Sequence, residues 1–573
     1  MTIEPLRTVP AVLSRLDTAF SDFAAAFHEG QYALWLGSGI SRDRVPDVSA
    51  LLERVLEMLR SSIDTQDAQC AYRSALREVL GLAQLEDDEL DGIDYALEVG
   101  EWPLRRRIVR ALVSHYSKVL DVLVGDDKPQ DYLVWSGLDV SNTYGSPDLE
   151  PDVEHYCIAI LMLEGLVGHV VTANWDGLLE KALGNLTLAF DAVARVVITP
   201  DDFRQPGRRI EIIKFHGCAV RAREDEEVYR PLLIARESQI AAWTSQAQNR
   251  PMRKHLELLY TDRPSLMIGL SAQDANLQTV FATAIDDLAR PWPATPPAIV
   301  LSEESLQTHH RNLLMLTYGS AHQGNATAIA DSALLGSFGK PTLLGLVLAS
   351  LTEKLASLLE HVLLSTWSTA DVQGLRGNLL SLRNAAANRA DTDRSAFIVR
   401  FMDVLNLTLT VFRTGHVPAV GGSRYEPLSE LPIAQTIHSP DFPAHAFGWL
   451  SIAVAMVGRG RALGAWSVLP GDSTTPGDGV LRLVTEQRDA RVFFVKDGAT
   501  RTILELENSI DDRDGSVFIV VAAEEPPASA RSSSPRFGRN GKVSAGHFSI
   551  ATNIADTASA DELYEAFKLA GGF

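Results

Sequence analysis

A short apolar run that ends in a glycine-rich turn constrains the fold of this chain more than any other stretch. Residues 32–36, YALWL, have the length and composition of a buried parallel strand, and Gly37-Ser38-Gly39-Ile40-Ser41 follows directly. Because glycine has no side chain, the backbone can turn sharply here and approach a ligand, while N–H groups at a helix start can face phosphate oxygens. Taken alone, the pattern is more typical of an ordinary strand-to-helix turn. It predicts a dinucleotide site only together with other stretches.

Short apolar runs alternate with helical patterns over the first half of the chain. An amphipathic pattern over residues 11–29 predicts one helix ahead of the first strand. Strand-like runs follow, with helical stretches between them, at residues 169–172, 210–215, 265–268 and 298–301. This order predicts an α/β fold: a Rossmann-like parallel sheet with helices on both faces. Ligands bind such sheets beyond the carboxyl ends of the strands.

Polar side chains follow the runs at residues 169–172 and 210–215. Asn174 lies in the segment TANWD, between Thr172 and Asp176, and its amide offers a donor and an acceptor to a ribose hydroxyl or another amide. Asp176 suits a helix cap, and a purely structural role for both residues stays open. His216 precedes Gly217 and has a ring that exchanges protons near neutral pH.

The run at residues 265–268 also ends in small and polar residues. Gly269 permits close approach, and Ser271 can bind a phosphate or a ribose. Asp274 or Asn276 can cap the next helix. Because four strand ends carry such groups, we predict that they form one site.

Composition and charge exclude several classes of protein. Hydrophobic residues make up 46% of the chain and charged residues 22%, which is typical of a globular protein. The net charge is -21, and residues 1–319 carry 30 Lys and Arg against 47 Asp and Glu. Since an acidic surface repels a polyanion, we predict no direct nucleic-acid binding by the N-terminal region.

The cysteine count and the apolar runs bear on compartment and metal. Cys70, Cys157 and Cys218 are too few and too widely spaced for a disulfide framework or a four-ligand zinc site. The sequence shows neither an apolar run of the length of a membrane span nor the apolar core of a signal peptide. We therefore predict a cytoplasmic protein without a membrane segment.

The four strand-end motifs, in this order, resemble those of the sirtuins, and more closely the sirtuin-like domains of bacterial defence proteins. The resemblance covers residues 15–310 and implies a Rossmann-like NAD-binding fold, with Asn174 and His216 at the catalytic positions. The residues that it places in contact with NAD are Gly37, Ser38, Gly39, Ser41, Asp47, Thr172, Asp176, Gly269 and Ser271.

Departures from the sirtuin pattern limit the reactions that the resemblance implies. Sirtuins that deacylate proteins carry two pairs of cysteines between the His-Gly and the later Gly-Ser motifs, whereas this chain has only Cys218 there. Ser38 stands where sirtuins commonly have Ala, and residues 42–44 differ from the usual lid sequence. The resemblance therefore implies an enzyme without zinc that hydrolyses NAD to nicotinamide and ADP-ribose as an effector of anti-phage defence. An NAD-dependent deacylase, an ADP-ribosyltransferase and a non-catalytic NAD-sensing module remain alternatives.

The residues suggest a mechanism for NAD hydrolysis. Nicotinamide is a cationic leaving group, and its departure leaves an oxocarbenium-like ribose. We expect Asn174 to orient the ribose or the attacking water, and His216 to bind ribose hydroxyls or act as general base. The glycine turn and Ser271 would hold the pyrophosphate, and Asp47 would support the nicotinamide pocket.

The second half of the chain has a different pattern of expected helices and strands. We divide the chain into residues 1–320, the catalytic domain; 321–460, a helical linker or assembly region; and 461–573, an α+β regulatory or partner-binding domain. Strands are expected at residues 480–485, 491–495, 500–506 and 516–522. Residues 525–542, rich in Ser, Pro and Arg, predict a loop, or alternatively a basic segment that meets a phosphate or an acidic partner.

Defence enzymes of this kind are usually kept silent until infection. By analogy alone, the resemblance suggests a HerA-type ATPase or a short prokaryotic Argonaute as partner, and a self-assembling homo-oligomer is also open.

Overall fold

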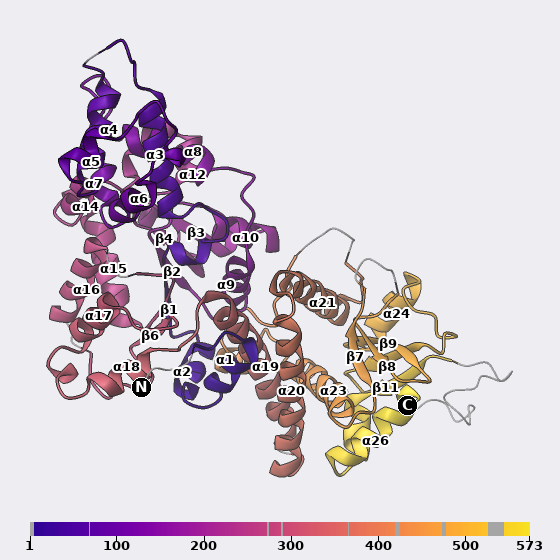
Figure 1. Cartoon of the computed structure of the whole chain (residues 1–573). Coiled ribbons are helices and arrows are strands. Elements are labelled where there is room, and N and C mark those ends of the chain that lie inside the picture. The colour runs from indigo at the N-terminus through magenta and orange to yellow at the C-terminus, as the bar shows by residue number, and fades with distance from the viewer. Residues whose placement is uncertain are drawn as a thin grey trace.

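The computed structural model describes residues 5–67, 69–271, 274–287, 290–364, 366–418, 424–472, 477–524 and 544–573. Within these residues a six-stranded sheet occupies the first half of the chain, and a five-stranded sheet lies near the C-terminus. Long helices lie between the two sheets, and a lobe of helices stands on the first sheet (Figure 1). The predicted loop at residues 525–542 lies outside the described residues.

All strands of the first sheet are parallel, in the order β3-β4-β2-β1-β5-β6. Their bounds are Ala33–Leu36 (β1), His169–Thr172 (β2), Ala194–Val197 (β3), Ile210–Lys214 (β4), Ser265–Ile268 (β5) and Ile299–Ser302 (β6). Leu36 is level with Thr172 and Ile268, and Thr172 is level with Lys214. The carboxyl ends of four neighbouring strands therefore meet at one edge, and the predicted parallel sheet is confirmed.

Helices cover both faces of this sheet because its buried side chains alternate between two cores. Leu34 and Leu36 face one core and Trp35 faces the other. The first face is covered by α1 (Val9–Leu16), α2 (Ser21–His28), α9 (Val153–Leu163) and α10 (Leu178–Leu186). The second is covered by α14 (Glu237–Trp243), α15 (Arg250–Asp262), α16 (Ala275–Asp287), α17 (Thr308–Tyr318) and α18 (Ala326–Ala333).

Two of the sequence predictions for this half need correction. The single helix expected at residues 11–29 is two helices, because the chain turns at residues 17–20, where the Phe20 N–H bonds to the Arg15 carbonyl and Phe20 packs edge-on against Phe23. β3 was not predicted, because this edge strand is short and contains Arg195 among its apolar residues.

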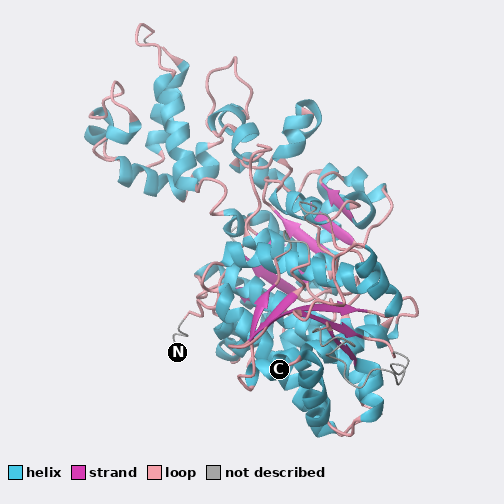
Figure 2. Ribbon diagram, turned by 90° about the vertical axis from the view of Figure 1, so that its right-hand side faces the viewer, coloured by secondary structure: helices cyan, strands magenta, loops and turns pink. Residues whose placement is uncertain are grey.

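The helical lobe has a hydrophobic core of its own and lies at the carboxyl edge of the sheet. It stands at the top of Figures 1 and 2, above the strands. Its core joins helices from residues 48–143 to the segment that follows β4. The helices are α3 (Val48–Ser61), α4 (Ala71–Gly81), α5 (Asp87–Asp91), α6 (Arg105–Val113), α7 (Tyr116–Val119), α8 (Val140–Thr143) and α12 (Ala219–Glu224). Short helices α11 (Phe190–Val193) and α13 (Glu226–Tyr229) lie in nearby connections.

The long helix α19 (Gly339–Leu363) belongs to the cores of both halves. It packs against α1 and α9 beside the first sheet and against α20 (Thr369–Ala390) and α23 (Ala444–Ala462) on its other side. Helices α21 (Arg394–Thr414) and α22 (Ile433–His438) complete this layer. The Leu335 N–H bonds to the Leu301 carbonyl of β6 (3.1 Å), so contacts of the first sheet extend past residue 320. The three-part division of the chain stays a prediction.

The C-terminal sheet is mixed, with the order β11-β10-β9-β8-β7. The first three strands of this order are parallel and the last three antiparallel. The strands are β7 (Ser467–Pro470), β8 (Leu481–Val484), β9 (Asp489–Val495), β10 (Val517–Val521) and β11 (Gly546–Ser549), with helices α24 (Gly498–Leu506), α25 (Ile550–Asp556) and α26 (Ala560–Gly571). The strand expected at residues 500–506 is wrong: α24 lies there, begun by Asp497, which caps the Thr500 N–H.

Two described helices, α19 and α21, are long and apolar enough to cross a membrane by length and composition. The apolar window of α19 is 83% buried, as in the core helix of a soluble protein, whereas that of α21 is 33% buried. The burial of α19 is compatible with a soluble domain, the burial of α21 does not distinguish the two cases, and the cytoplasmic location stays a prediction.

Candidate functional site

Backbone contacts join the glycine turn after β1 to the turn after β5. The Gly37 N–H donates to the Ile268 carbonyl (3.1 Å) and the Gly39 N–H to the Gly269 carbonyl (3.2 Å). A Cβ at Gly37 would lie 2.2 Å from the Gly269 oxygen, and Gly269 itself has a φ of +62°. The glycines are therefore required for the two turns to touch each other, which the sequence did not predict.

Asn174 is attached to the glycine turn through its side chain. Its Nδ2 donates to the Gly37 carbonyl at 3.2 Å and lies 3.5 Å from Ser41 Oγ. Its backbone N–H donates to Thr172 Oγ1 (3.0 Å), which fixes the segment after β2. Because a carbonyl oxygen only accepts, the atom that faces Gly37 is the amide nitrogen, and the carbonyl oxygen Oδ1 is directed elsewhere.

His216 is buried at the end of β4 and contacts the start of α16. Its Nε2 lies 3.2 Å from Asn276 Nδ2 and 3.6 Å from Asp274 Oδ2. Burial lowers the pKa of His216 below its ordinary value, and the carboxylate of Asp274 only partly opposes that shift. The ring is therefore neutral at pH 7. Trp175 links the β2 and β4 turns, because its Nε1 donates to the His216 carbonyl (2.9 Å).

Two of the predicted residues have clear structural partners. Asp176 is buried, and its Oδ1 accepts from the Leu178 N–H (3.2 Å) at the start of α10. Its carbonyl accepts from the buried Lys214 ammonium. Asp47 is exposed and caps α3 by accepting from the Ala50 N–H (2.8 Å).

Asp47 and Asp176 therefore have structural roles, whereas the other predicted residues meet at the carboxyl edge of the sheet. The glycine turn, Asn174 and Gly269 are joined by direct hydrogen bonds or backbone packing, and His216 is attached to them through Trp175. Ser38 and Ser271 are exposed at the same edge. Exposed hydroxyls, an amide and an imidazole at one edge are donors and acceptors of the kind that a pyrophosphate and two riboses need.

Three residues of this edge were not singled out from the sequence. His155 of α9 is buried with its Nε2 3.3 Å from Ser41 Oγ, and Asp152 caps the same helix. Glu303 follows β6 and accepts a hydrogen bond from the Gly269 N–H; burial raises its pKa to about 7. A sequence signal exists only for Asp152, an Asp ahead of an apolar helical run.

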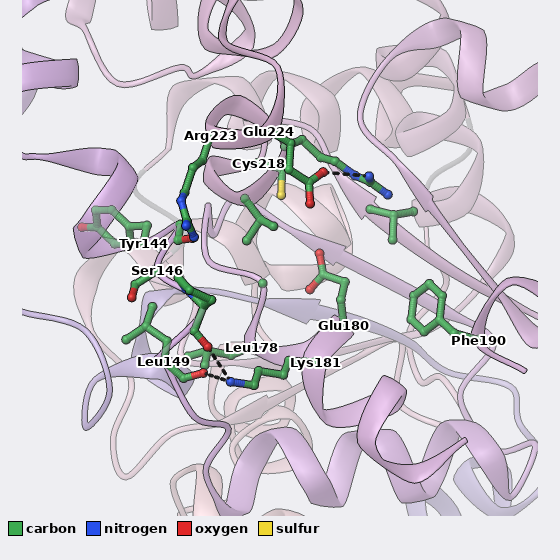
Figure 3. Close-up of a pocket in the computed structure, with 16 residues that line it drawn as sticks. Tyr144, Ser146, Leu149, Leu178, Glu180, Lys181, Phe190, Cys218, Arg223 and Glu224 are labelled. Atoms are coloured by element: carbon green, nitrogen blue, oxygen red, sulfur yellow. Dashed lines mark hydrogen bonds and ion pairs between the residues drawn. The ribbon is translucent and has the colours of Figure 1, made fainter. Parts of the chain in front are cut away.

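A cavity of about 530 Å³ lies beside this cluster, toward β3. The loop at residues 144–149, α10 and α12 line it, and Cys218 lies in its wall (Figure 3). Its arginines already have partners: Arg221 pairs with Glu224 (3.0 Å), and Arg223 donates to the Gly145 carbonyl (3.0 Å). Neither Asn174 nor His216 lines the cavity, so its position does not bear on their role.

Metal binding finds no support among the residues that the structure describes. No group of three or more His, Cys, Asp or Glu side chains in these ranges could hold an ion. The three cysteines are free and buried. That the protein needs no zinc stays a prediction.

Comparison with known proteins supports the sirtuin resemblance. Residues 168–322 match the family model of the SIR2-like domain. The match begins at β2 and includes the segments of Asn174, His216 and Gly269, while the glycine turn after β1 lies outside it. No curated protein matches the chain. SIR2-like domains are commonly NAD-dependent enzymes, which supports an NAD-related function in general. Residues 168–322 are thus similar to a SIR2-like domain, and they contribute strands β2 to β6 to a Rossmann-like parallel sheet.

Proposed function

We propose that this chain hydrolyses NAD to nicotinamide and ADP-ribose at the carboxyl edge of the first sheet. The observation that carries the proposal is the pairing of two groups there. The Asn174 amide is fixed by Gly37, and a neutral, buried His216 is attached to the same segment through Trp175. A binding module has no need of a proton acceptor beside an oriented amide.

Asn174 would act on the ribose or on the attacking water. Its Nδ2 is held by the Gly37 carbonyl, so Oδ1 is left to accept a hydrogen bond from a ribose hydroxyl or from water. As nicotinamide leaves, positive charge develops on the ribose, and an amide oxygen directed at that carbon stabilises it.

His216 would accept a proton. With its own proton on Nδ1, the neutral ring accepts at Nε2 from Asn276 Nδ2 (3.2 Å). A ribose hydroxyl or water that replaces Asn276 at Nε2 can transfer its proton to the ring. Asp274, 3.6 Å from Nε2, stabilises the charged imidazolium that results.

The test is nicotinamide release from NAD by the purified full-length chain, alone and after co-expression with its genomic neighbours. We expect release that His216→Ala and Asn174→Ala each reduce on the order of 10²- to 10⁴-fold. A requirement for a second substrate would indicate a deacylase or transferase instead. NAD binding without release under every condition would favour a sensing module.

The biological role that we propose is NAD depletion in anti-phage defence, released by a partner or a phage trigger. A HerA-type ATPase or a short prokaryotic Argonaute is the partner that the family resemblance suggests. Stimulation of nicotinamide release by the co-purified neighbour would support this role, and full activity of the chain alone would argue against a silencing partner.

A further inference from the structure

A series of contacts that is buried at its centre leads from Asn174 to the second half of the protein. Asn174 Nδ2 lies 3.5 Å from Ser41 Oγ, and Ser41 Oγ lies 3.3 Å from His155 Nε2. Ser41 and His155 are completely buried. The mechanism proposed above does not use His155, so its place behind Ser41 calls for an explanation.

The tautomer of His155 follows from its second nitrogen. Nδ1 accepts from the backbone N–H of Asp152 (3.1 Å), so the single proton of a neutral ring is on Nε2 and is donated to Ser41 Oγ. Burial lowers the pKa of His155 and keeps the ring neutral.

The direction of the Ser41 hydroxyl proton is set by these contacts. Ser41 Oγ receives hydrogen atoms from His155 Nε2 and from Asn174 Nδ2, which occupy its acceptor sites. Its own O–H must then point to a third direction. Because Ser41 is completely buried, its effect on a ligand is indirect: its Oγ holds the Asn174 amide by accepting from Nδ2.

Lys340, the second residue of α19, ends this series of contacts, because it pairs with Asp152 at the start of α9. Its Nζ lies 2.8 Å from Asp152 Oδ2, while Arg44 lies 3.1 Å from Asp152 Oδ1. Asp152 caps α9 by accepting from the Val153 N–H (2.8 Å), and its own N–H bonds to His155. Lys340 also pairs with Asp43, two residues after Ser41 (2.6 Å). The lysine therefore fixes the start of α9 against the turn that carries Ser41.

We propose that His155 and Lys340 are positioning residues for the proposed NAD hydrolysis. His155 holds Ser41 Oγ as an acceptor for the Asn174 amide, and Lys340 holds His155 in place through Asp152. This inference rests on the proposed function, and it extends the catalytic unit beyond residue 320 into α19.

Two isosteric substitutions of His155 separate positioning from helix capping. Asn places its amide near the Nδ1 position and keeps a partner for the Asp152 N–H, whereas Gln places its amide near Nε2 and keeps a donor to Ser41. In the full-length chain we expect His155→Asn to lower kcat about tenfold, the loss of one oriented hydrogen bond, with a thermal midpoint close to wild type. His155→Gln should retain most of kcat. Full activity of His155→Asn, or a lower kcat for Gln than for Asn, overturns the proposal.

A double substitution tests whether His155 acts through Ser41. If it does, His155→Asn added to Ser41→Ala should reduce kcat by less than about twofold beyond Ser41→Ala alone. Independent, multiplicative losses would contradict the proposed order of contacts.

Lys340 is tested with a conservative variant and a matched control. Lys340→Ala should lower kcat several-fold, and Lys340→Arg should restore it, because Arg keeps the charge next to Asp152. The control is Lys128→Ala, whose side chain is 33% exposed against 24% for Lys340 and also pairs with an aspartate. Equal activity of Lys340→Ala and Lys128→Ala refutes the role of Lys340.

Failure of the proposed NAD hydrolysis can be distinguished from failure of the proposed positioning role. If the wild-type chain binds NAD but releases no nicotinamide, hydrolysis is refuted while the contact chain is still measurable. Calorimetric NAD affinities should then follow the same order, with His155→Asn weaker than His155→Gln, and equal affinities would overturn the positioning role.

Discussion

Replacement of Gly37 by alanine should separate the turns after β1 and β5. The new Cβ would lie 2.2 Å from the Gly269 oxygen and 2.6 Å from the Leu270 Cα, and both are backbone atoms that cannot rotate away. Overpacking of this kind costs about 1–3 kcal/mol. Separation also weakens the bonds from Gly37 to Ile268 and from Gly39 to Gly269, each worth about 1 kcal/mol. We therefore expect a loss of about 3 kcal/mol in the local stability of this edge.

Hydrogen exchange of peptides from β1 and β5 measures this loss where it occurs. A loss of about 3 kcal/mol corresponds to amide exchange that is faster by roughly 10²-fold. Gly374→Ala in α20 is the matched control, because a Cβ there meets nothing within 4 Å, and alanine in a helix should stabilise by up to about 1 kcal/mol. Unchanged exchange of β1 and β5 in Gly37→Ala would refute the packing role of the glycine and favour a role in ligand approach alone.

Three further predictions concern the core and the site. Lys354→Met leaves the carboxylate of Glu164 buried beside Tyr425 and should lower the free energy of unfolding by about 3–5 kcal/mol; a thermal midpoint equal to wild type would contradict this. The lowered pKa of His216 places the acidic limb of kcat/KM below pH 6.5, with loss of activity as pH falls, and a limb above pH 6.5 would exclude His216 as the base. Asn174→Asp keeps the size of the side chain but repels the Gly37 carbonyl, so it should lose at least tenfold in nicotinamide release; wild-type turnover would show that the amide nitrogen is not needed.

The strands and their ends could be predicted from the sequence because their signals are local. Apolar runs such as residues 32–36 and 265–268 end at small or polar residues, and parallel strands place those ends at one edge. Strand β3 and helix α24 were missed because short edge strands and short amphipathic helices give weak periodic patterns.

The contacts that complete the site could not be predicted because they join distant segments. His155 lies inside an apolar helix and meets Ser41 across 114 residues, and Lys340 meets Asp43 across 297. The role of Gly37 was predicted as ligand approach, whereas the structure gives it a packing partner in Gly269, which no local pattern indicates.

The most direct test of the central claim is the product balance of NAD turnover by the full-length chain without any acylated peptide or acceptor protein. NAD hydrolysis predicts nicotinamide and ADP-ribose in equal amounts, both abolished by His216→Ala. Nicotinamide that appears only with an added acceptor, or that persists in His216→Ala, would contradict the assignment of this site as an NAD hydrolase.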